Sequence, residues 1–269
     1  MKRIALVWWW NKAEEVYPYW RDGLRAAMEY IGQDHEVDIL LGESHPKEDY
    51  DAVIYWGDSN GSFFEGIENV KGKKGMILTT DPQNIENLKK MDVVFCESTP
   101  VYESVRRLGI RAVKAFGTDT DFYKPDPTIT KDIEYFYPAT FSPWKLQHKV
   151  AYLGDKLWCV GTVQPDGETD YQACLQSGVN VAVGYFKAEY IRDLYQRAQK
   201  VIIPAIHGSE RTVLEAMASG ILPEVTNKKN IRTHSFIEEY EKSGLTPREF
   251  VVTHYSPEVY GKTILKALS

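Results

Sequence analysis

The sequence is poor in the residues that mark several classes of protein. It has three cysteines in 269 residues, Cys96, Cys159 and Cys174, and their spacing is neither paired nor of a metal-binding type. We therefore expect reduced, mostly buried thiols and a reducing, cytoplasmic compartment rather than a disulfide-stabilised secreted fold. The six histidines also form no ligand cluster, so no histidine-based metal site is predicted.

Long apolar runs and a strong charge of one sign are missing as well. No stretch reaches the ~18 apolar residues of a membrane-spanning helix. Residues 4–10 are apolar and follow Lys2 and Arg3, but this run is short and has no small-residue cleavage site, so we interpret it as a buried strand rather than a signal peptide. The net charge of −6 gives no general attraction to nucleic acid.

Short apolar runs alternate with helical patterns along the whole chain. This alternation predicts parallel sheets that are covered by helices on both faces. One helix is expected from Pro18, which is favoured at a first helical position, with Trp20, Leu24 and Ile31 on its apolar face. The predicted strands are residues 4–10, 35–40, 52–56, 75–80, 92–96 and 111–115, and then 133–138, 157–160, 179–183, 201–203 and 221–225.

Residues 200–220 are the most informative stretch. An apolar strand closes at Pro204, a turn follows, and a helix leads to Gly220 at the place of a C-cap. Ser209 is predicted to cap this helix, and Glu210 is a residue type that is favoured in the first turn of a helix. The free backbone N–H groups of this turn are expected to attract an anion such as a diphosphate. Such units occur in any parallel α/β sheet, so the pattern alone leaves a purely structural turn open.

The order of residues in this stretch favours an anion-binding turn over a purely structural one. Residues 209–220, Ser-Glu-Arg-Thr-Val-Leu-Glu-Ala-Met-Ala-Ser-Gly, resemble the donor-site signature of retaining GT-B glycosyltransferases, especially family four (group 1). In that family two glutamates contact the nucleotide sugar: the second holds the ribose hydroxyls and the first contacts the sugar. Glu215 matches the second glutamate, whereas His207 stands at the position of the first.

Two further segments resemble the same family. Residues 116–127 are similar to its inter-domain segment, with matches at Gly117, Asp119, Phe122 and Pro125. Residues 140–145 occupy the place of a loop in which an arginine and a lysine embrace the diphosphate. Lys145 matches that lysine, Thr140 replaces the arginine, and the nearby His148 and Lys149 are alternative sources of charge.

The resemblance implies a GT-B fold, that is, two Rossmann-like α/β domains with parallel sheets facing across a cleft. The expected domains are residues 1–120, on the acceptor side, and residues 121–269, which bind the nucleotide sugar. In the family a C-terminal helix often crosses back to the first domain.

The implied activity is transfer of a sugar from a UDP- or GDP-linked donor to an acceptor, with retention of configuration and without a metal or another cofactor. The catalytic candidates are His207, Lys145 and Asp81, the last of which stands where the family has an acceptor-side loop. The residues expected to bind the donor are Gly184, Tyr185, Gly208, Ser209, Arg211, Thr212 and Glu215.

Two alternatives remain open at the level of the sequence. An inverting GT-B enzyme, such as the virus-type enzymes that glycosylate modified DNA bases, would use Asp81 or another carboxylate as a general base. A nucleotide-sugar-binding protein without catalysis would explain His207 and Thr140. The acceptor (a saccharide, a lipid-linked sugar, a small molecule or a modified DNA base) and the oligomeric state also remain open.

Overall fold

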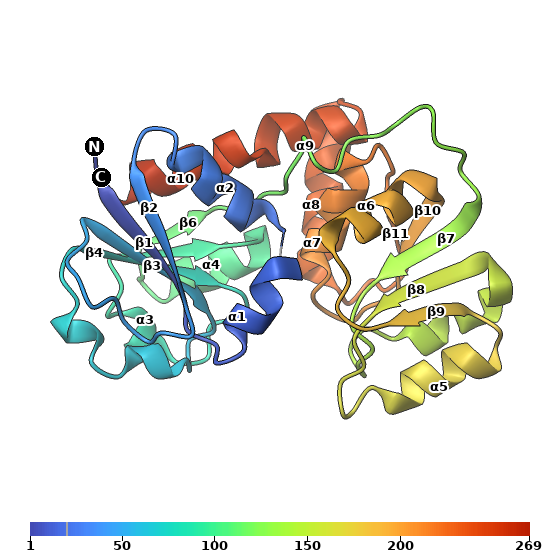
Figure 1. Cartoon of the computed structure of the whole chain (residues 1–269), viewed down its shortest axis with the longest axis horizontal. Helices are drawn as coiled ribbons and strands as arrows, with labels where there is room; N and C mark the ends of the chain where they lie inside the picture. Colours follow the sequence, from blue (N-terminus) through green and yellow to red (C-terminus); the bar gives the residue numbers. More distant parts are fainter. Residues whose placement is uncertain (20) are drawn as a thin grey trace. The chain divides into compact units, whose positions relative to one another are not determined.

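The computed structural model describes residues 1–19 and 21–269. It divides into two compact units: unit 1 comprises residues 1–117 and 256–269, and unit 2 comprises residues 118–255 (Figure 1). The division at residue 117 lies close to the expected boundary at residue 120. The last helix lies in the range 121–269 but belongs to unit 1; the resemblance implied that a C-terminal helix can cross back to the first domain.

Unit 1 is built on a six-stranded sheet in the order β2-β1-β3-β4-β5-β6, in which all neighbours are parallel. All six strands predicted for the first half of the chain are present. They are β1 (Arg3–Trp8), β2 (Glu36–Leu41), β3 (Ala52–Gly57), β4 (Lys73–Leu78), β5 (Val93–Cys96) and β6 (Ala112–Lys114).

Helices cover both faces of this sheet. Ile4 and Leu6 of β1 pack with α2 (Gly23–Ile31) and α10 (Pro257–Ala267), whereas Ala5 and Val7 pack on the opposite side with α3 (Ile85–Leu88) and α4 (Thr99–Arg107). Because successive side chains of a strand point to opposite faces, this division follows from the uninterrupted apolar run of β1. The remaining short elements are α1 (Ala13–Val16), η1 (Tyr17–Tyr19), η2 (Ser62–Phe64) and η3 (Ile67–Asn69).

The first long helix begins later than predicted. Pro18 lies in η1, and α2 begins at Gly23 because Oδ1 of Asp22 accepts a hydrogen bond from the Arg25 backbone N–H at 3.0 Å. Trp20, which was predicted for the same helix, lies outside the described residues.

The final helix packs on α2 through a glycine. A Cβ on Gly261 would lie 2.8 Å from Cδ1 of Tyr30 and 3.3 Å from the Ala27 carbonyl oxygen, so α10 approaches α2 more closely than another residue would allow. The two helices lie side by side in Figure 1. This contact explains why the C-terminal residues belong to unit 1.

Unit 2 contains a five-stranded parallel sheet in the order β11-β10-β7-β8-β9. The strands are β7 (Ile133–Pro138), β8 (Leu157–Gly161), β9 (Asn180–Val183), β10 (Ala198–Ile203) and β11 (Glu224–Val225). The helices are α5 (Glu168–Gln176), α6 (Ala188–Arg197), α7 (Glu210–Ala218), α8 (Ile231–Ser243) and α9 (Pro247–Tyr255), with the 3-10 turns η4 (Gln147–Lys149) and η5 (Ala151–Lys156).

Two general expectations can be compared with the structure. The three cysteines are free and buried, as predicted. Among the described residues, no helix is both long enough and apolar enough to cross a membrane.

Candidate functional site

The turn between β10 and α7 has an unusual backbone. Gly208 and Ser209, which we call the α7 turn, both have left-handed conformations, with φ of +72° and +75°. A left-handed serine is uncommon and costs free energy that the surrounding contacts must offset. The predicted helix cap is wrong, because the Ser209 side chain makes no capping hydrogen bond. Its Oγ accepts instead from Nζ of Lys145 at 3.0 Å and lies 3.3 Å from the Tyr137 hydroxyl.

The buried side chain of Asn230 is hydrogen-bonded to the backbone of the α7 turn and of the segment before it. Nδ2 of Asn230 donates to the carbonyl oxygens of Ala205 and Gly208, at 3.2 and 3.0 Å. Its Oδ1 accepts from the backbone N–H of Thr233 and thereby caps α8. Asn230 is 1% exposed, so these bonds are shielded from water and fix the turn to the start of α8.

Lys145 brings a cation to the α7 turn. A Cβ on Gly208 would lie 2.7 Å from Nζ of Lys145, so the ammonium rests directly on the glycine. Among the described residues, no carboxylate lies within ion-pairing distance of this Nζ, and its hydrogen-bond partner is the neutral Ser209 hydroxyl. Burial lowers the pKa of Lys145 to about 8; the Glu210 carboxylate opposes this shift and the Arg232 guanidinium adds to it.

A buried ion pair lies beside the lysine. Glu210, the first residue of α7, pairs with Arg232 of α8, and both residues are less than a tenth exposed. The pairing neutralises a carboxylate that would otherwise repel an anion at the helix start. Together Lys145, Arg232 and Glu210 leave a net positive charge at this point of unit 2.

Glu215 is buried on α7 and bonded through both oxygens. Oε1 accepts from Nε of Arg211 at 2.7 Å, and Oε2 accepts from the Tyr195 hydroxyl of α6 at 3.1 Å. Glu215 is 2% exposed, whereas the Arg211 side chain is 47% exposed. A carboxylate has about four lone-pair directions, so further hydrogen bonds to Glu215 are chemically possible.

His207 is exposed and stacks on a tryptophan. Its ring lies 5.8 Å from that of Trp144, with 16° between the ring planes. The backbone N–H of Ile206 donates to the Trp144 carbonyl oxygen at 2.8 Å. The loop after β7 and the loop after β10 are therefore joined next to Lys145 and the α7 turn.

Three further residues predicted to bind the donor are Thr212, on α7, and Gly184 and Tyr185, which follow β9. The Thr212 hydroxyl donates to the Pro138 carbonyl oxygen at 3.3 Å, so this side chain ties α7 to the end of β7. Gly184 follows β9 with φ of +142° and its N–H donates to the Gly161 carbonyl oxygen, while Tyr185 is 57% exposed.

The alternative cations of the 140–149 loop do not replace Lys145. His148 is bonded through Nδ1 to Asp170 at 2.6 Å, and Lys149 is exposed on η4. Thr140, in place of the family's arginine, pairs its hydroxyl with that of Thr162 at 3.1 Å. The cation that contacts the α7 turn is thus the one that the sequence predicted, Lys145.

Asp81 belongs to the other unit of the chain. It lies in unit 1, exposed, in the segment that follows β4. The other predicted site residues all belong to unit 2.

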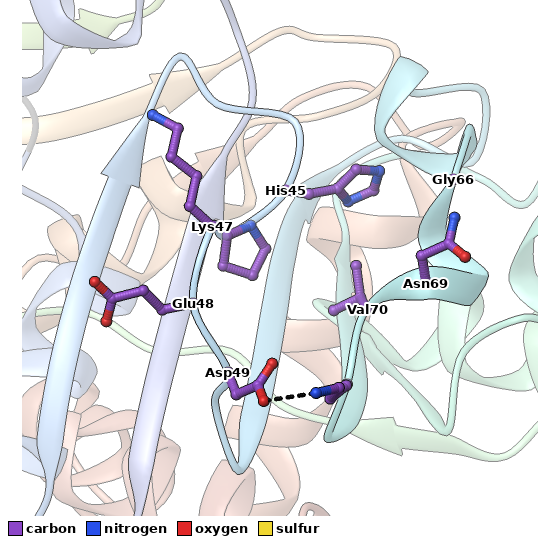
Figure 2. Close-up of a pocket in the computed structure, with 9 residues that line it drawn as sticks. His45, Lys47, Glu48, Asp49, Gly66, Asn69 and Val70 are labelled. Carbon is purple, nitrogen blue, oxygen red and sulfur yellow. Dashed lines mark hydrogen bonds and ion pairs between the residues drawn. The ribbon is translucent and has the colours of Figure 1, made fainter.

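Unit 1 also has a polar hollow of about 310 Å³, between the 45–49 segment and residues 66–71 (Figure 2). Its charged groups are paired: Nζ of Lys71 donates to Asp49 at 2.8 Å, the dashed line in Figure 2. His45 bonds the Tyr55 hydroxyl at 3.0 Å and the Glu65 carbonyl oxygen at 2.7 Å. None of the predicted site residues lines this hollow. Within residues 1–19 and 21–269, no group of His, Cys, Asp and Glu side chains is placed to hold a metal ion.

Several residues at the α7 turn were missed by the sequence analysis. Asn230 had a local signal, because an asparagine just before a helix is a frequent N-cap. Tyr137, Arg232 and Trp144 had none, because each reaches its partner through a contact between segments that are distant in the sequence.

The sequence matches no protein-family profile and no curated protein. The fold, in contrast, is similar to those of solved structures along the whole chain. Anabaena HepE, solved in complex with UDP and glucose, is 14% identical with a TM-score of 0.66, and the match covers 100% of this chain and 99% of that one. AviGT4, a glycosyltransferase involved in avilamycin A biosynthesis, is 16% identical with a TM-score of 0.67 and coverages of 100% and 97%. The trehalose-6-phosphate synthase OtsA is 8% identical with a TM-score of 0.58 and coverages of 91% and 76%.

The sequence identities to these structures are too low for a function to be transferred to this chain. The structural similarity shows the fold alone. Two α/β units with parallel sheets, matched over the full length to such structures, confirm the GT-B fold that the sequence predicted.

Proposed function

We propose that this chain is a glycosyltransferase that moves a sugar from a UDP- or GDP-linked donor to an acceptor, with retention of configuration, in the manner of family four. The observation that carries the proposal is the Lys145 ammonium at the α7 turn, which has a neutral hydroxyl as its partner and no carboxylate within ion-pairing distance among the described residues. The complexes and names of the similar structures support it: HepE was solved with UDP and glucose, and AviGT4 is a glycosyltransferase.

The α7 turn suits a diphosphate for three physical reasons. An ammonium has three N–H donors, and Lys145 directs one of them to Ser209. The first N–H groups of a helix have no partner within the helix, and its dipole is positive at that end. Gly208, which has no side chain, lets a phosphate approach the backbone. In this proposal Thr212 contributes its backbone N–H, since its hydroxyl is bonded to Pro138.

The nucleoside is assigned to the α6 and α7 side of unit 2. Glu215 would accept hydrogen bonds from the ribose hydroxyls, because a carboxylate has about four lone-pair directions, and the Arg211 side chain is exposed enough to contact the donor as well. Gly184 and Tyr185, at the carboxyl end of β9, are proposed to contact the base. Ligands of open α/β sheets bind at the carboxyl ends of the strands.

The chemistry that we propose is electrostatic. As the bond between the sugar and the diphosphate breaks, negative charge develops on the leaving phosphate, and the preorganised Lys145 ammonium and helix N–H groups would stabilise it. They would supply the positive charge that a metal ion supplies in other transferases. We therefore propose neither a metal ion nor another cofactor. His207 would contact the sugar, and Asp81 of unit 1 would lie on the acceptor side.

Transfer assays test this function. The purified protein would be incubated with UDP- and GDP-sugars and a panel of saccharide, lipid-linked, small-molecule and modified-DNA acceptors. We expect nucleoside diphosphate release and a product with the anomeric configuration of the donor, both strongly reduced in Lys145→Ala. An inverted product would contradict retention. Tight binding of a donor without release or transfer on any acceptor would contradict the enzymatic role and favour a binding protein.

A further inference from the structure

Two aromatic side chains adjoin the α7 turn on separate loops. Trp144 immediately precedes Lys145, and His207 immediately precedes Gly208. Their rings are nearly parallel, with centroids 5.8 Å apart and 16° between the planes. The Ile206 N–H bond to the Trp144 carbonyl oxygen, 2.8 Å long, holds the two loops together. We call this pair the Trp144–His207 platform.

We propose that the Trp144–His207 platform receives the sugar ring of the donor and that Trp144 is a specificity-determining residue that positions His207. This inference rests on the proposed function, because it requires a nucleotide sugar with its diphosphate at the α7 turn. Trp144 has no counterpart among the donor-site residues that the sequence motifs indicated.

The position of the platform matches the covalent structure of the donor. In a nucleotide sugar the sugar ring is bonded directly to the terminal phosphate. On both loops the platform residue is the direct neighbour of a residue at the anion site, Lys145 on one and Gly208 on the other. The group attached to a phosphate at the α7 turn therefore lies within reach of the two rings.

The chemistry of the two rings suits a sugar. One face of a pyranose presents C–H groups, which pack favourably on the electron-rich face of an aromatic ring, while the hydroxyls at its edge need hydrogen-bond partners. Trp144 holds the imidazole in place by stacking, and the exposed His207 offers an aromatic ring together with nitrogens that donate or accept. A histidine on a loop has several accessible rotamers, and stacking against the half-buried Trp144 selects one of them.

A nucleobase is the competing occupant, because aromatic rings also stack on bases. The contacts of Glu215 argue against it. This residue, proposed to bind ribose, points from α7 to Tyr195 of α6, whereas the platform is formed by the loops that follow β7 and β10. The nucleoside and the platform thus use different elements of unit 2.

Calorimetric titrations with UDP and UDP-glucose, and with GDP and GDP-mannose, test the platform in the full-length protein. We expect Trp144→Ala and His207→Ala to leave the affinity for the bare diphosphate within twofold and to weaken the matching nucleotide sugar by about five- to tenfold, which lies within the range of an aromatic contact. Trp144→Phe should restore most of the difference. Tyr152→Ala, which removes an exposed aromatic residue elsewhere in unit 2, is the control and should change neither affinity.

The same titrations separate the possible failures. Equal losses for the diphosphate and the nucleotide sugar in a folded Trp144→Ala protein would assign the platform to the base and overturn the inference, as would unchanged affinity for both. If Trp144→Ala fails to fold, His207→Ala decides: a loss confined to the nucleotide sugar supports the inference, and equal losses on both ligands or none on either overturn it. If the unmodified protein binds no nucleotide, the proposed function fails and the inference fails with it.

Discussion

Lys145 carries the charge on which the proposed site depends. Its ammonium is held over Gly208 by the Ser209 hydroxyl, and the charged groups that act on it are Glu210 and Arg232. Because burial disfavours the charged form, the ammonium gains from an anion that replaces the hydration it has lost. The residue is therefore suited to binding a phosphate rather than to stabilising the fold.

The lowered pKa of Lys145 predicts how UDP binding depends on pH. The pKa falls from its usual 10.5 to about 8, so the side chain is charged below pH 8 and becomes neutral above it. A bound diphosphate favours the charged form and raises this pKa, so binding takes up a proton above pH 8. We expect the Kd for UDP to rise by up to about tenfold from pH 8 to pH 9, since one pH unit changes the proton-bound fraction at most tenfold.

Calorimetry at pH 7, 8 and 9 measures this dependence. Lys145→Arg, whose guanidinium stays charged throughout this range, is the matched control and should show a much smaller change. A pH dependence equal in the two proteins would show that Lys145 is not the titrating group.

At the scale of single residues, the sequence motifs predicted that Lys145 and the turn at Gly208 and Ser209 belong to one site. They did not predict the conformation of Ser209. Serine is a common helix cap, and its left-handed backbone here depends on Lys145 and Asn230, which are distant in the sequence. Local propensity could not reveal these tertiary contacts.

Helix α7 is the element that organises the site. Thr212 ties its first turn to β7, Glu210 pairs with Arg232 of α8, and Glu215 accepts from Tyr195 of α6. These contacts fix the helix N-terminus relative to the sheet, and Lys145 is bonded to Ser209 at the same end. A preorganised site of this kind loses little entropy when a ligand binds.

Glu215 gives a prediction that belongs to this helix. If its carboxylate binds ribose hydroxyls, Glu215→Gln should weaken UDP by about 1.5–3 kcal/mol, the range for hydrogen bonds to a charged group. It should weaken 2′-deoxy-UDP less, because that ligand has lost one of the hydroxyls. Titration of both ligands measures the difference.

Tyr195→Phe provides the control for this prediction. It removes the hydrogen bond inside the protein and leaves the Glu215 charge in place, so the preference for UDP over 2′-deoxy-UDP should persist. Equal losses on both ligands in Glu215→Gln would mean that Glu215 only supports α7.

The elements themselves were largely predictable, since the apolar runs located every strand found among residues 1–19 and 21–269. Helix α9 was missed although Thr246 and Glu249 form reciprocal capping bonds, a signal that the sequence contains. The predicted strand at residues 221–225 is reduced to Glu224–Val225, because the Ile221 N–H donates to the Ala216 carbonyl oxygen of α7 and Pro223 has no N–H to pair.

At the scale of the whole chain, the alternation of strands and helices predicted parallel sheets, and the family resemblance implied two α/β units. The structure contains two such units. The family resemblance implied that a C-terminal helix can cross back to the first domain, but the contact that places the last helix in unit 1, the close approach of Gly261 to α2, could not be predicted from the sequence. Which unit binds the donor is a separate matter, and we propose unit 2 on the basis of the α7 turn.

The affinity of the full-length protein for UDP, measured by calorimetry with and without the Lys145 side chain, tests the central claim most directly. We predict that Lys145→Ala weakens UDP binding by ~1.5–3 kcal/mol, or about 10- to 150-fold, because a charge-assisted hydrogen bond is lost. Lys149→Ala, which removes an exposed lysine four residues further on, should leave the affinity unchanged. An unchanged Kd in Lys145→Ala, or a loss carried by Lys149→Ala instead, would contradict the assignment of the α7 turn as the diphosphate site.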